Sequence, residues 1–425
     1  MLTNGRLVLW LTRKTLEWRR TTGRSRRELR SVAAMGSSCS QLGVPPPRGP
    51  RHVGCTDLMM GHTAQGCFFR LYYPCEETGK TERPSWIPCR EYFNGLADFM
   101  KLNRTFTVPI FHYMFGSFKI PAMPDAPFKS NEKYPVVIFS HGLGAFRTLY
   151  STICVELASQ GFIVASVEHR DSSASATYYC HEATQSETMV LKSNALQEWM
   201  YYRALQQGEK EFPLRNQQVK LRAKECVDAL ETLAEINSGK QVTNDLQTHF
   251  DWTTLENSMD LSKVSVMGHS FGGATVIQAL SQDDKFKCGV ALDTWMLPVD
   301  DETIPKVRQP IFFINSERFQ WPSNICRMRK LDSDVVERKM ITIRGTVHQS
   351  FPDFTFMTGN LIGKWMKLKG AIDPHVAMDL SNKATLAFLQ RHLGLKNNFN
   401  QWDRLIDGDD ENLIPGTNVT LQASL

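Results

Sequence analysis

No stretch of this sequence holds the roughly 18 to 20 consecutive apolar residues that a membrane-spanning helix needs. The chain has 425 residues, of which 42% are hydrophobic and 22% charged, and this composition is usual for globular proteins. Its length is enough for two domains or for one large domain with surface insertions. We expect one large domain with a water-soluble body.

The sequence also lacks the cysteine spacing of a metal site. Its ten cysteines are scattered, without a C-x-x-C pair or a Cys/His pattern typical of zinc. Their density is too low for a disulfide scaffold, and several lie in apolar runs where buried free thiols are expected. We therefore predict neither a metal site nor a disulfide framework.

Excess positive charge is confined to the start of the chain. Residues 1–34 hold nine Arg and Lys against two Glu, so this segment contributes +7 to the net charge of +5. The remaining chain carries −2 and lacks the basic surface that binds a nucleic-acid backbone. We expect no nucleic acid as a partner.

The N-terminal residues do not form a clear secretory signal. Arg13 and Lys14 interrupt the apolar patch at residues 7–11 before a signal core of about 7 to 15 residues is complete. The Arg-rich composition also fits a mitochondrial presequence or a stretch that the mature protein lacks. If translation starts at Met35, the pattern M-G-x-x-x-S of residues 35–40 allows N-myristoylation of a cytoplasmic protein.

Two sequons point to secretion instead. Asn103 and Asn418 each begin an N-x-T triplet, the acceptor pattern of glycoproteins, although such triplets also arise by chance. The compartment therefore stays open at this point.

The chain divides into a lead-in, a folded domain and a tail. Residues 1–53 are basic and then rich in Ser, Pro and Gly, so we expect this segment to be disordered or removed. Residues 54–395 carry alternating strand and helix patterns and form the predicted domain. Residues 396–425 are predicted as a polar C-terminal tail.

Short apolar runs alternate with helical patterns within the predicted domain. Strands are predicted at residues 67–73, 135–140, 162–167, 264–268, 289–292, 311–314 and 340–343, and helices at 148–160, 217–236, 272–281 and 380–392. From residue 136 onward the strand runs are nearly unbroken in apolar character, as in a parallel sheet covered on both faces. The pattern predicts the α/β class, with a doubly wound, mostly parallel sheet flanked by helices. Residues 171–216 and 238–260 lack a strong strand signal and are expected as insertions.

The most specific local signal is a G-x-S-x-G pattern from Gly268 to Gly272, between a hydrophobic run and a small-residue helix start. A sharp strand-to-helix turn here lifts the Ser270 hydroxyl above the sheet, and a side chain at either glycine would collide with its neighbours. A plain tight turn is the alternative. The flanking strand and helix favour Ser270 as a nucleophile.

A serine nucleophile needs a base that removes its proton. Three histidines follow Ser270 in the chain, namely His348, His375 and His392. His375 and His392 fall in or beside helical patterns, where a surface or capping role is expected. His348 lies in a loop directly after a predicted strand, so we predict it as the base.

The base in turn needs an acid that holds its tautomer. Asp293 closes the predicted strand at 289–292, the next strand after the nucleophile. The other candidates lie in polar runs where exposed carboxylates are usual, namely Asp283, Asp284, Asp300 and Asp301. Asp293 is therefore predicted as the acid.

A developing oxyanion needs two backbone N–H donors. The residue after the serine, Phe271, supplies the first. The second is expected from the H-G-x-G sequence that starts at His141, where the Leu143 N–H is our candidate. An ordinary glycine turn is the alternative at this loop.

Residues 169–171 spell the kinase catalytic-loop triplet His-Arg-Asp. No other kinase motif accompanies it, so we interpret it as a structural loop.

These motifs together resemble the platelet-activating factor acetylhydrolases, more closely the plasma type than the intracellular type II enzyme. The shared text covers about residues 52–420 and includes VGCTDLM at 53–59, RLYYP at 70–74, FSHGLGAFRTLY at 139–150, SASATYY at 173–179, GHSFGGATVIQ at 268–278, KMITIRG at 339–345 and DGDDENLIPGTN at 407–418. The resemblance implies an α/β-hydrolase fold in which residues 54–395 are the catalytic domain. It assigns the triad to Ser270, Asp293 and His348, and the oxyanion donors to Leu143 and Phe271.

The resemblance also implies the activity. It predicts a calcium-independent serine esterase, without a cofactor, that removes the sn-2 acetyl or short oxidised acyl chain of platelet-activating factor and related phospholipids. Trp295 and Gln349 match residues that line the family's pocket, whereas Thr294 replaces the small Ala usual beside the acid. Plasma-type members are secreted, so secretion is implied even though residues 1–34 do not supply the expected signal.

A phospholipid substrate implies a lipoprotein or membrane surface as partner. Residues 354–369 mix apolar side chains with Trp and Lys in helical register, as helices at a lipid surface do, and the apolar side chains of residues 94–118 are a second candidate, although such stripes are more often core. Two other functions stay open: a lipid-binding α/β-hydrolase without turnover, and a lipase for longer acyl chains.

Overall fold

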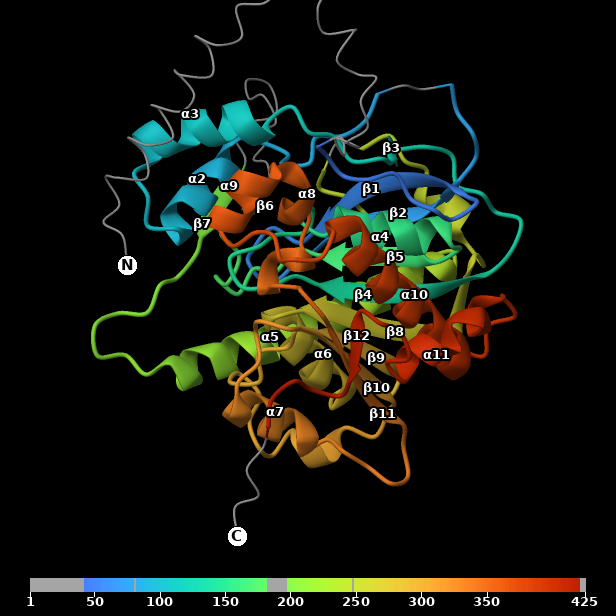
Figure 1. The fold of residues 1–425 in the computed structure, drawn as a ribbon. Coiled ribbons are helices and arrows are strands. Elements are labelled where there is room, and N and C mark those ends of the chain that lie inside the picture. Colours follow the sequence, from blue (N-terminus) through green and yellow to red (C-terminus); the bar gives the residue numbers. More distant parts are fainter. Residues whose placement is uncertain (1–41, 80–81, 182–196, 247, 421–425) are drawn as a thin grey trace, which may run out of the picture.

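Ten strands form one sheet in the computed structural model, which describes residues 42–79, 82–181, 197–246 and 248–420 (Figure 1). The order across the sheet is β12-β11-β10-β9-β8-β4-β5-β2-β1-β3. The strands are β1 (His52–Met60), β2 (Cys67–Cys75), β3 (Met123–Pro124), β4 (Tyr134–Ser140), β5 (Ile163–Val167), β8 (Met259–His269), β9 (Phe286–Leu292), β10 (Ile311–Ser316), β11 (Arg338–Ile343) and β12 (Leu413–Pro415).

The centre of the sheet, from β5 to β11, is parallel, whereas β2 and β12 add antiparallel strands at its two sides. All the central strands coincide with predicted ones. Their apolar side chains are buried on both faces, which is why they lack a period-2 pattern.

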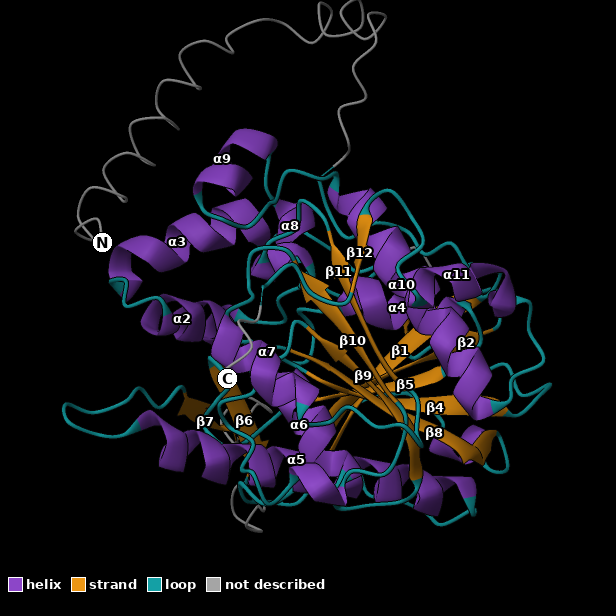
Figure 2. Cartoon of the chain, turned by 60° about the horizontal axis from the view of Figure 1, so that its bottom comes forward, coloured by secondary structure: helices purple, strands orange, loops and turns teal. Residues whose placement is uncertain are grey.

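Helices cover both faces of this sheet (Figure 2). One face packs against α4 (Ser151–Ser159) and α10 (Pro374–Leu393), and the other against α5 (Glu211–Asn237) and α6 (Phe271–Leu280). Each pair of helices forms a buried apolar cluster with the sheet face that it covers, so the two clusters lie on opposite faces of the sheet. The predicted doubly wound α/β fold is therefore confirmed.

The remaining helices are short or lie outside these two layers. They are α2 (Arg90–Phe99), α3 (Arg104–Phe115), α7 (Pro322–Arg329), α8 (Phe354–Met357), α9 (Asn360–Trp365) and α11 (Asp403–Ile406). In both views α2, α3 and α9 lie together at one end of the molecule (Figures 1 and 2). No helix in the described residues is long and apolar enough to cross a membrane.

Packed structure begins before the predicted domain boundary at residue 54. Strand β1 starts at His52, and the preceding residues are tied to α4 by the Arg48 N–H, which donates to Glu156 at 2.8 Å, and by the Gly49 N–H, which donates to Ser159 at 3.1 Å. The expected disorder therefore does not extend over residues 42–53. The strand signal of β1 is weakened by a charged residue, the half-buried Asp57, which pairs with Arg70 opposite it on β2.

The predicted insertion at residues 171–216 contains regular structure. Strands β6 (Ala176–Cys180) and β7 (Gln197–Tyr201) form a separate antiparallel pair, and α5 begins at Glu211. The polar or half-buried side chains of β7 explain its weak signal.

The predicted polar tail is also part of the fold up to residue 420. Leu405, Ile406 and Leu413 are buried, and β12 pairs with β11. The Thr342 hydroxyl donates to the Gly416 carbonyl at 2.8 Å, which ties this segment to the strand that leads toward the site.

Candidate active site

Ser270 occupies a strained turn between β8 and α6. Its backbone has φ 59° and ψ −112°, a conformation that side-chain-bearing residues rarely adopt. An added Cβ at Gly272 would lie 2.0 Å from the Ser140 carbonyl oxygen, and one at Gly268 would lie 2.4 Å from the Gly272 oxygen. The predicted steric need for both glycines is therefore confirmed.

The three residues predicted as a triad meet at the carboxyl ends of parallel strands. The Ser270 Oγ lies 2.9 Å from His348 Nε2, and His348 Nδ1 lies 2.7 Å from Asp293 Oδ2. Ser270 follows β8, Asp293 follows β9, and His348 follows β11 after a four-residue turn. This order lets the imidazole accept the hydroxyl proton while the carboxylate holds Nδ1 protonated.

Asp293 is buried and held by a neighbour that the sequence analysis did not identify. The Ser316 N–H donates to Asp293 Oδ1 at 2.8 Å, and the Ser316 hydroxyl donates to Oδ2 at 2.7 Å. The Asn324 side chain fixes the next residues, since it donates to the Thr294 carbonyl at 2.8 Å and accepts the Met296 N–H at 2.9 Å. Thr294 itself is buried against Gly273.

His348 remains partly accessible, with 22% of its side chain exposed. Its ring stacks on Phe319 with centroids 3.6 Å apart and lies 4.5 Å from the ring of His269. Burial, followed by the nearby His348, holds the pKa of His269 well below its usual range. His269 is therefore neutral beside the base.

The two predicted oxyanion donors flank the serine. Phe271 is the first residue of α6, where the N–H groups have no partner inside the helix. In the loop after β4, the Gly142 N–H donates to the Tyr150 hydroxyl at 3.1 Å and the Gly144 N–H donates to the Ser173 carbonyl at 2.8 Å. No acceptor for the Leu143 N–H is found in the described part of the chain. Both predicted donors are thus available to a ligand.

A cavity of about 210 Å³ opens above Ser270. Its lining includes Gly142, Leu143, His348 and Gln349, and its walls are largely apolar. The wall residues are Leu96, Phe99, Met100, Phe111, Phe115, Leu149, Tyr150, Phe354, Met366 and Leu368. The predicted pocket residue Gln349 lies here.

The other predicted pocket residue is placed differently. Trp295 packs edge-on against Phe271, with centroids 5.7 Å apart, and is not part of this lining. It is half-buried against the apolar cluster that α5 and α6 share.

The two predicted lipid-surface segments divide between cavity wall and exposed side chains. Leu96, Phe111, Phe115 and Phe354 face the cavity or the core rather than solvent. The large apolar side chains that remain exposed on these segments are Met100, Phe106, Tyr113, Leu361 and Trp365, which we call the apolar rim. Of these, Met100 also lines the cavity. The rim residues lie on or beside the helices that wall the cavity.

Within the described residues, one group of side chains lies close enough together to hold a metal ion: His269, Asp293 and His348. Asp293 and His348 already share the hydrogen bond of the triad, and His269 Nδ1 accepts from the Tyr150 hydroxyl at 2.8 Å. The chemistry that this group supports is proton transfer.

Sequence reasoning missed Ser316, Tyr150, His269 and Phe319 as neighbours of the triad. Ser316 is the last residue of β10, so its position at the carboxyl edge of the sheet could have identified it as a neighbour of the triad. No local pattern points to Tyr150 or Phe319, because their contacts join distant segments.

Comparisons with known proteins find relatives that match most of this chain. The family model of platelet-activating factor acetylhydrolase, isoform II, matches residues 36–413. The platelet-activating factor acetylhydrolase of Gallus gallus is 54% identical over 397 residues, 92% of this chain and 94% of that protein. The one of Bos taurus is 53% identical over 383 residues, 90% of this chain and 84% of that protein.

The solved structure of a ferulic acid esterase from Streptomyces cinnamoneus has a similar fold. Its TM-score is 0.59 at 16% identity, and the match covers 88% of this chain and 99% of that chain. At this identity the likeness concerns the fold alone, and it agrees with the predicted α/β-hydrolase architecture.

Proposed function

The chain belongs to the platelet-activating factor acetylhydrolase family, and from this premise we propose that Ser270, His348 and Asp293 carry its chemistry. The protein is a carboxylic ester hydrolase of the serine type whose substrates are acetyl esters of phospholipids. The observation that supports these roles best is the unbroken chain of hydrogen bonds from the Ser270 hydroxyl to the Asp293 carboxylate.

Acylation follows from this geometry. His348 Nε2 takes the proton from the Ser270 hydroxyl while the oxygen attacks the sn-2 carbonyl carbon. Asp293 stabilises the imidazolium that forms, because its carboxylate faces Nδ1 at 2.7 Å. The protonated His348 then donates to the departing glycerol oxygen, which leaves an acyl-enzyme on Ser270.

The oxyanion of each tetrahedral intermediate lies between the Leu143 and Phe271 N–H groups in this proposal. Water enters for deacylation, gives its proton to His348, and attacks the acyl carbon. The Ser270 oxygen then leaves with the proton returned by His348, and acetate or another short acid is released. No step needs a metal ion, so we propose that activity is independent of calcium.

Reaction with a fluorophosphonate probe tests the nucleophile. The native protein should be labelled and should hydrolyse a 2-acetyl phospholipid, and Ser270→Ala should lose both labelling and turnover. Ser265→Ala is a matched control, because Ser265 is also buried on β8. Full activity of Ser270→Ala would refute the catalytic role, and absent turnover in the native protein would favour a lipid-binding module.

We propose that the cavity selects short sn-2 chains, including truncated oxidised ones. The rings of Phe99, Phe111 and Phe115 and the limited volume of about 210 Å³ support this selection over a lipase for long chains. Rates on matched phospholipids with acetyl, short oxidised and long sn-2 chains provide the test. Equal or higher rates on long chains would favour the lipase.

We also propose that the apolar rim docks on a lipoprotein or membrane surface. Phe106, Tyr113 and Leu361 are 62%, 66% and 88% exposed. Phe106 and Tyr113 lie on α3, which walls the cavity, and Leu361 lies on α9, which ends just before the lining residue Met366. A lipid surface would bury these side chains and bring the sn-2 ester to the cavity.

Sedimentation with phosphatidylcholine vesicles tests the rim. Tyr113→Asp and Leu361→Asp should each bind vesicles more weakly by about tenfold, the effect of roughly 1.4 kcal/mol. Val335→Asp is the control, since Val335 is an apolar side chain that is 93% exposed outside the rim. Equal binding by all three variants would contradict the proposal.

For the compartment we propose secretion. The exposed positions of Asn103 and Asn418 support glycosylation there, whereas residues 1–41 with the Met35 start lie outside the described residues. Mass analysis of the mature N-terminus, before and after glycosidase treatment, separates a secreted glycoprotein from a myristoylated cytoplasmic protein.

A further inference from the structure

Two fully buried side chains bridge the loop after β4 and the turn that carries Ser270. The first is Arg222 on α5, whose Nη2 donates to the His141 carbonyl oxygen. The same guanidinium lies over the Phe271 ring, with Cζ 4.5 Å from the centroid. Arg222 thus contacts the segments that carry both predicted oxyanion donors.

The second bridge is Tyr150, at the start of α4. Its hydroxyl accepts the Gly142 N–H at 3.1 Å and donates to His269 Nδ1 at 2.8 Å. Burial raises the pKa of Tyr150 and lowers that of His269, so the hydroxyl stays protonated and the imidazole stays neutral. Both hydrogen bonds therefore persist at neutral pH.

The two bridges straddle the nucleophile. Tyr150 contacts His269, the residue before Ser270, and Arg222 contacts Phe271, the residue after it. On the loop, they hold His141 and Gly142, which directly precede the Leu143 N–H.

We propose that Arg222 and Tyr150 are positioning residues that hold the Leu143 and Phe271 N–H groups at a fixed separation around the oxyanion. This role rests on the proposed serine-esterase function. Neither side chain takes part in bond making, and each acts through the backbone of the loop and of the turn.

Fixed placement matters because oxyanion stabilisation depends on donors that are set before the reaction begins. Two glycines give this loop more backbone freedom than side-chain-bearing residues would, so its position depends on the contacts that hold it. Its far end is tied by the Gly144 N–H to the Ser173 carbonyl, so the two bridges complete the constraint around Leu143.

The burial of Arg222 is costly, which argues for a role beyond stability. Its Nε and Nη1 have no hydrogen-bond partner among the described residues, and the facing Asp171 carboxylate lies at 4.0 Å. A buried ion pair of this kind stabilises a fold little compared with apolar side chains of similar volume. The hydrogen bond from Arg222 to the His141 carbonyl gives the arginine a role that an apolar side chain could not fill.

Residues 169–171 also contact the groups that hold this loop. Asp171 faces Arg222, and His169 links Ser140 at 2.8 Å to Glu225 on α5 at 2.6 Å. Ser140 ends β4 immediately before the loop. The His-Arg-Asp triplet, interpreted from sequence as a structural loop, thus lies behind the oxyanion site.

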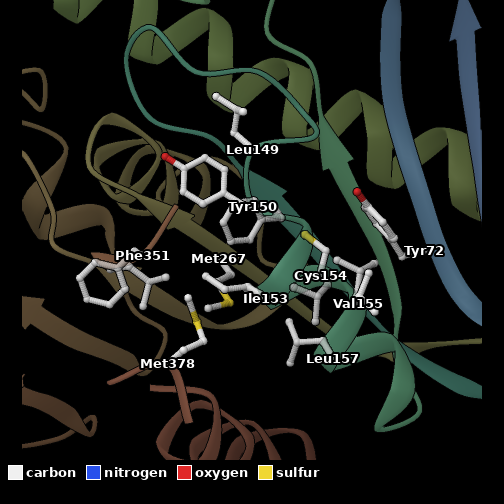
Figure 3. Close-up of a cluster of buried hydrophobic side chains, with 14 of the residues drawn as sticks. Tyr72, Leu149, Tyr150, Ile153, Cys154, Val155, Leu157, Met267, Phe351 and Met378 are labelled. Atoms are coloured by element: carbon white, nitrogen blue, oxygen red, sulfur yellow. The ribbon is translucent and has the colours of Figure 1, made fainter. Parts of the chain in front are cut away.

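The ring of Tyr150 is held in place by close packing, so its hydroxyl has a fixed position. Figure 3 shows its ring among buried side chains that include Ile153 and Met267, with the hydroxyl directed away from Leu157. Replacing this tyrosine by phenylalanine keeps the packed ring and removes only the bridging oxygen.

The test compares Arg222→Lys and Tyr150→Phe with two matched controls. Arg215→Lys alters another buried arginine of α5, whose guanidinium bonds Gln218 and Tyr202 instead of the loop. Tyr72→Phe removes another buried hydroxyl, which contacts Ser151. Four quantities are measured: kcat and KM on a short-chain ester, affinity for a trifluoromethyl ketone substrate analogue, and the thermal midpoint.

The ketone reports the oxyanion directly. Ser270 Oγ bonds to its carbonyl carbon, the hydroxyl proton passes to His348, and the former carbonyl oxygen carries the negative charge between the two N–H donors. We expect Arg222→Lys and Tyr150→Phe to lower kcat about 10- to 100-fold, a partial loss of oxyanion stabilisation, with KM within about twofold. Ketone affinity should fall by the same factor, whereas the controls should keep both values.

The proposal is overturned if kcat and ketone affinity fall no more in the two variants than in their controls, or if only KM changes. If Arg222→Lys does not fold, Tyr150→Phe decides the question alone, because its packing is preserved. Activity that survives in Ser270→Ala would instead refute the proposed function, so the two failures are distinguishable.

Discussion

The Ser316 hydroxyl donates a hydrogen bond to Asp293 Oδ2 at 2.7 Å, the same oxygen that faces His348 Nδ1. Ser316 therefore orients the carboxylate from the neighbouring strand β10. A hydrogen bond to a charged group contributes about 1.5 to 3 kcal/mol, so loss of this hydroxyl is expected to affect the acid.

Ser316→Ala should lower kcat about tenfold with little change in KM. The reason is that the Ser316 N–H still holds one carboxylate oxygen while Oδ2 loses its second donor. Steady-state kinetics on a short-chain ester measure the effect. Ser166→Ala is the control, since its buried hydroxyl donates to the Arg147 carbonyl away from the triad. Equal kcat values for the two variants would contradict the assignment.

Gly272→Ala should abolish most turnover. Its Cβ would lie 2.0 Å from the Ser140 carbonyl oxygen, so the turn that holds Ser270 must shift relative to the loop after β4. We expect kcat to fall by at least about 100-fold, the effect of losing one oxyanion donor. Gly359→Ala is the matched control because nothing lies within 4 Å of its added Cβ. Near-native activity in Gly272→Ala would show that the turn tolerates a side chain.

Glu225 should make stability depend on pH. Burial and the nearby Asp171 raise the pKa of Glu225 from 4.5 to about 8. Between these values the folded protein keeps a proton that the unfolded chain has lost. The contribution of Glu225 to the free energy of unfolding is therefore fully present below about pH 4.5 and is lost as pH rises through about 8.

Glu225→Gln removes this dependence, because glutamine can donate to His169 Nδ1 and accept the Arg170 N–H as the protonated acid does. The stability of the variant relative to the native protein should rise by about 1 to 3 kcal/mol between pH 5 and pH 8. Urea unfolding at both pH values measures the difference. A constant difference would show that Glu225 is ionised in the fold at both values.

Ile406→Ala should destabilise the protein although it lies in the predicted tail. Ile406 is fully buried in the apolar cluster that includes α10, so its truncation should cost about 2 to 4 kcal/mol. Denaturant unfolding provides the measurement. Val335→Ala, at a side chain that is 93% exposed, should stay within about 0.5 kcal/mol of the native protein. A similar small effect for Ile406→Ala would mean that the tail does not contribute to the core.

Much of the site was predictable because its constraints are local or follow chain order. The glycines around Ser270, a hydrophobic run before them and a helix after them specify the turn. Asp293 and His348 followed because parallel strands bring their carboxyl ends to one edge of a sheet.

The boundaries of the fold were less predictable because they depend on distant partners. Strand β12 has only three residues and ends at a proline, and it is recognised only by its pairing with β11. Strand β1 carries the half-buried Asp57, which the fold accommodates because Arg70 lies opposite. In the same way, only the structure shows which apolar side chains of residues 94–118 and 354–369 line the cavity and which form the apolar rim, with Met100 in both sets.

The amino-acid order by itself determined the fold class, the nucleophile and the two residues that complete its hydrogen-bonded chain. Only the tertiary structure decided which other side chains hold these three hydrogen-bonded residues in place. Tyr150 meets a histidine 119 positions away, and Arg222 meets a carbonyl 81 positions away. Hydrogen bonds and ring contacts depend on a few ångströms of distance in space, and chain order does not specify such distances between remote segments.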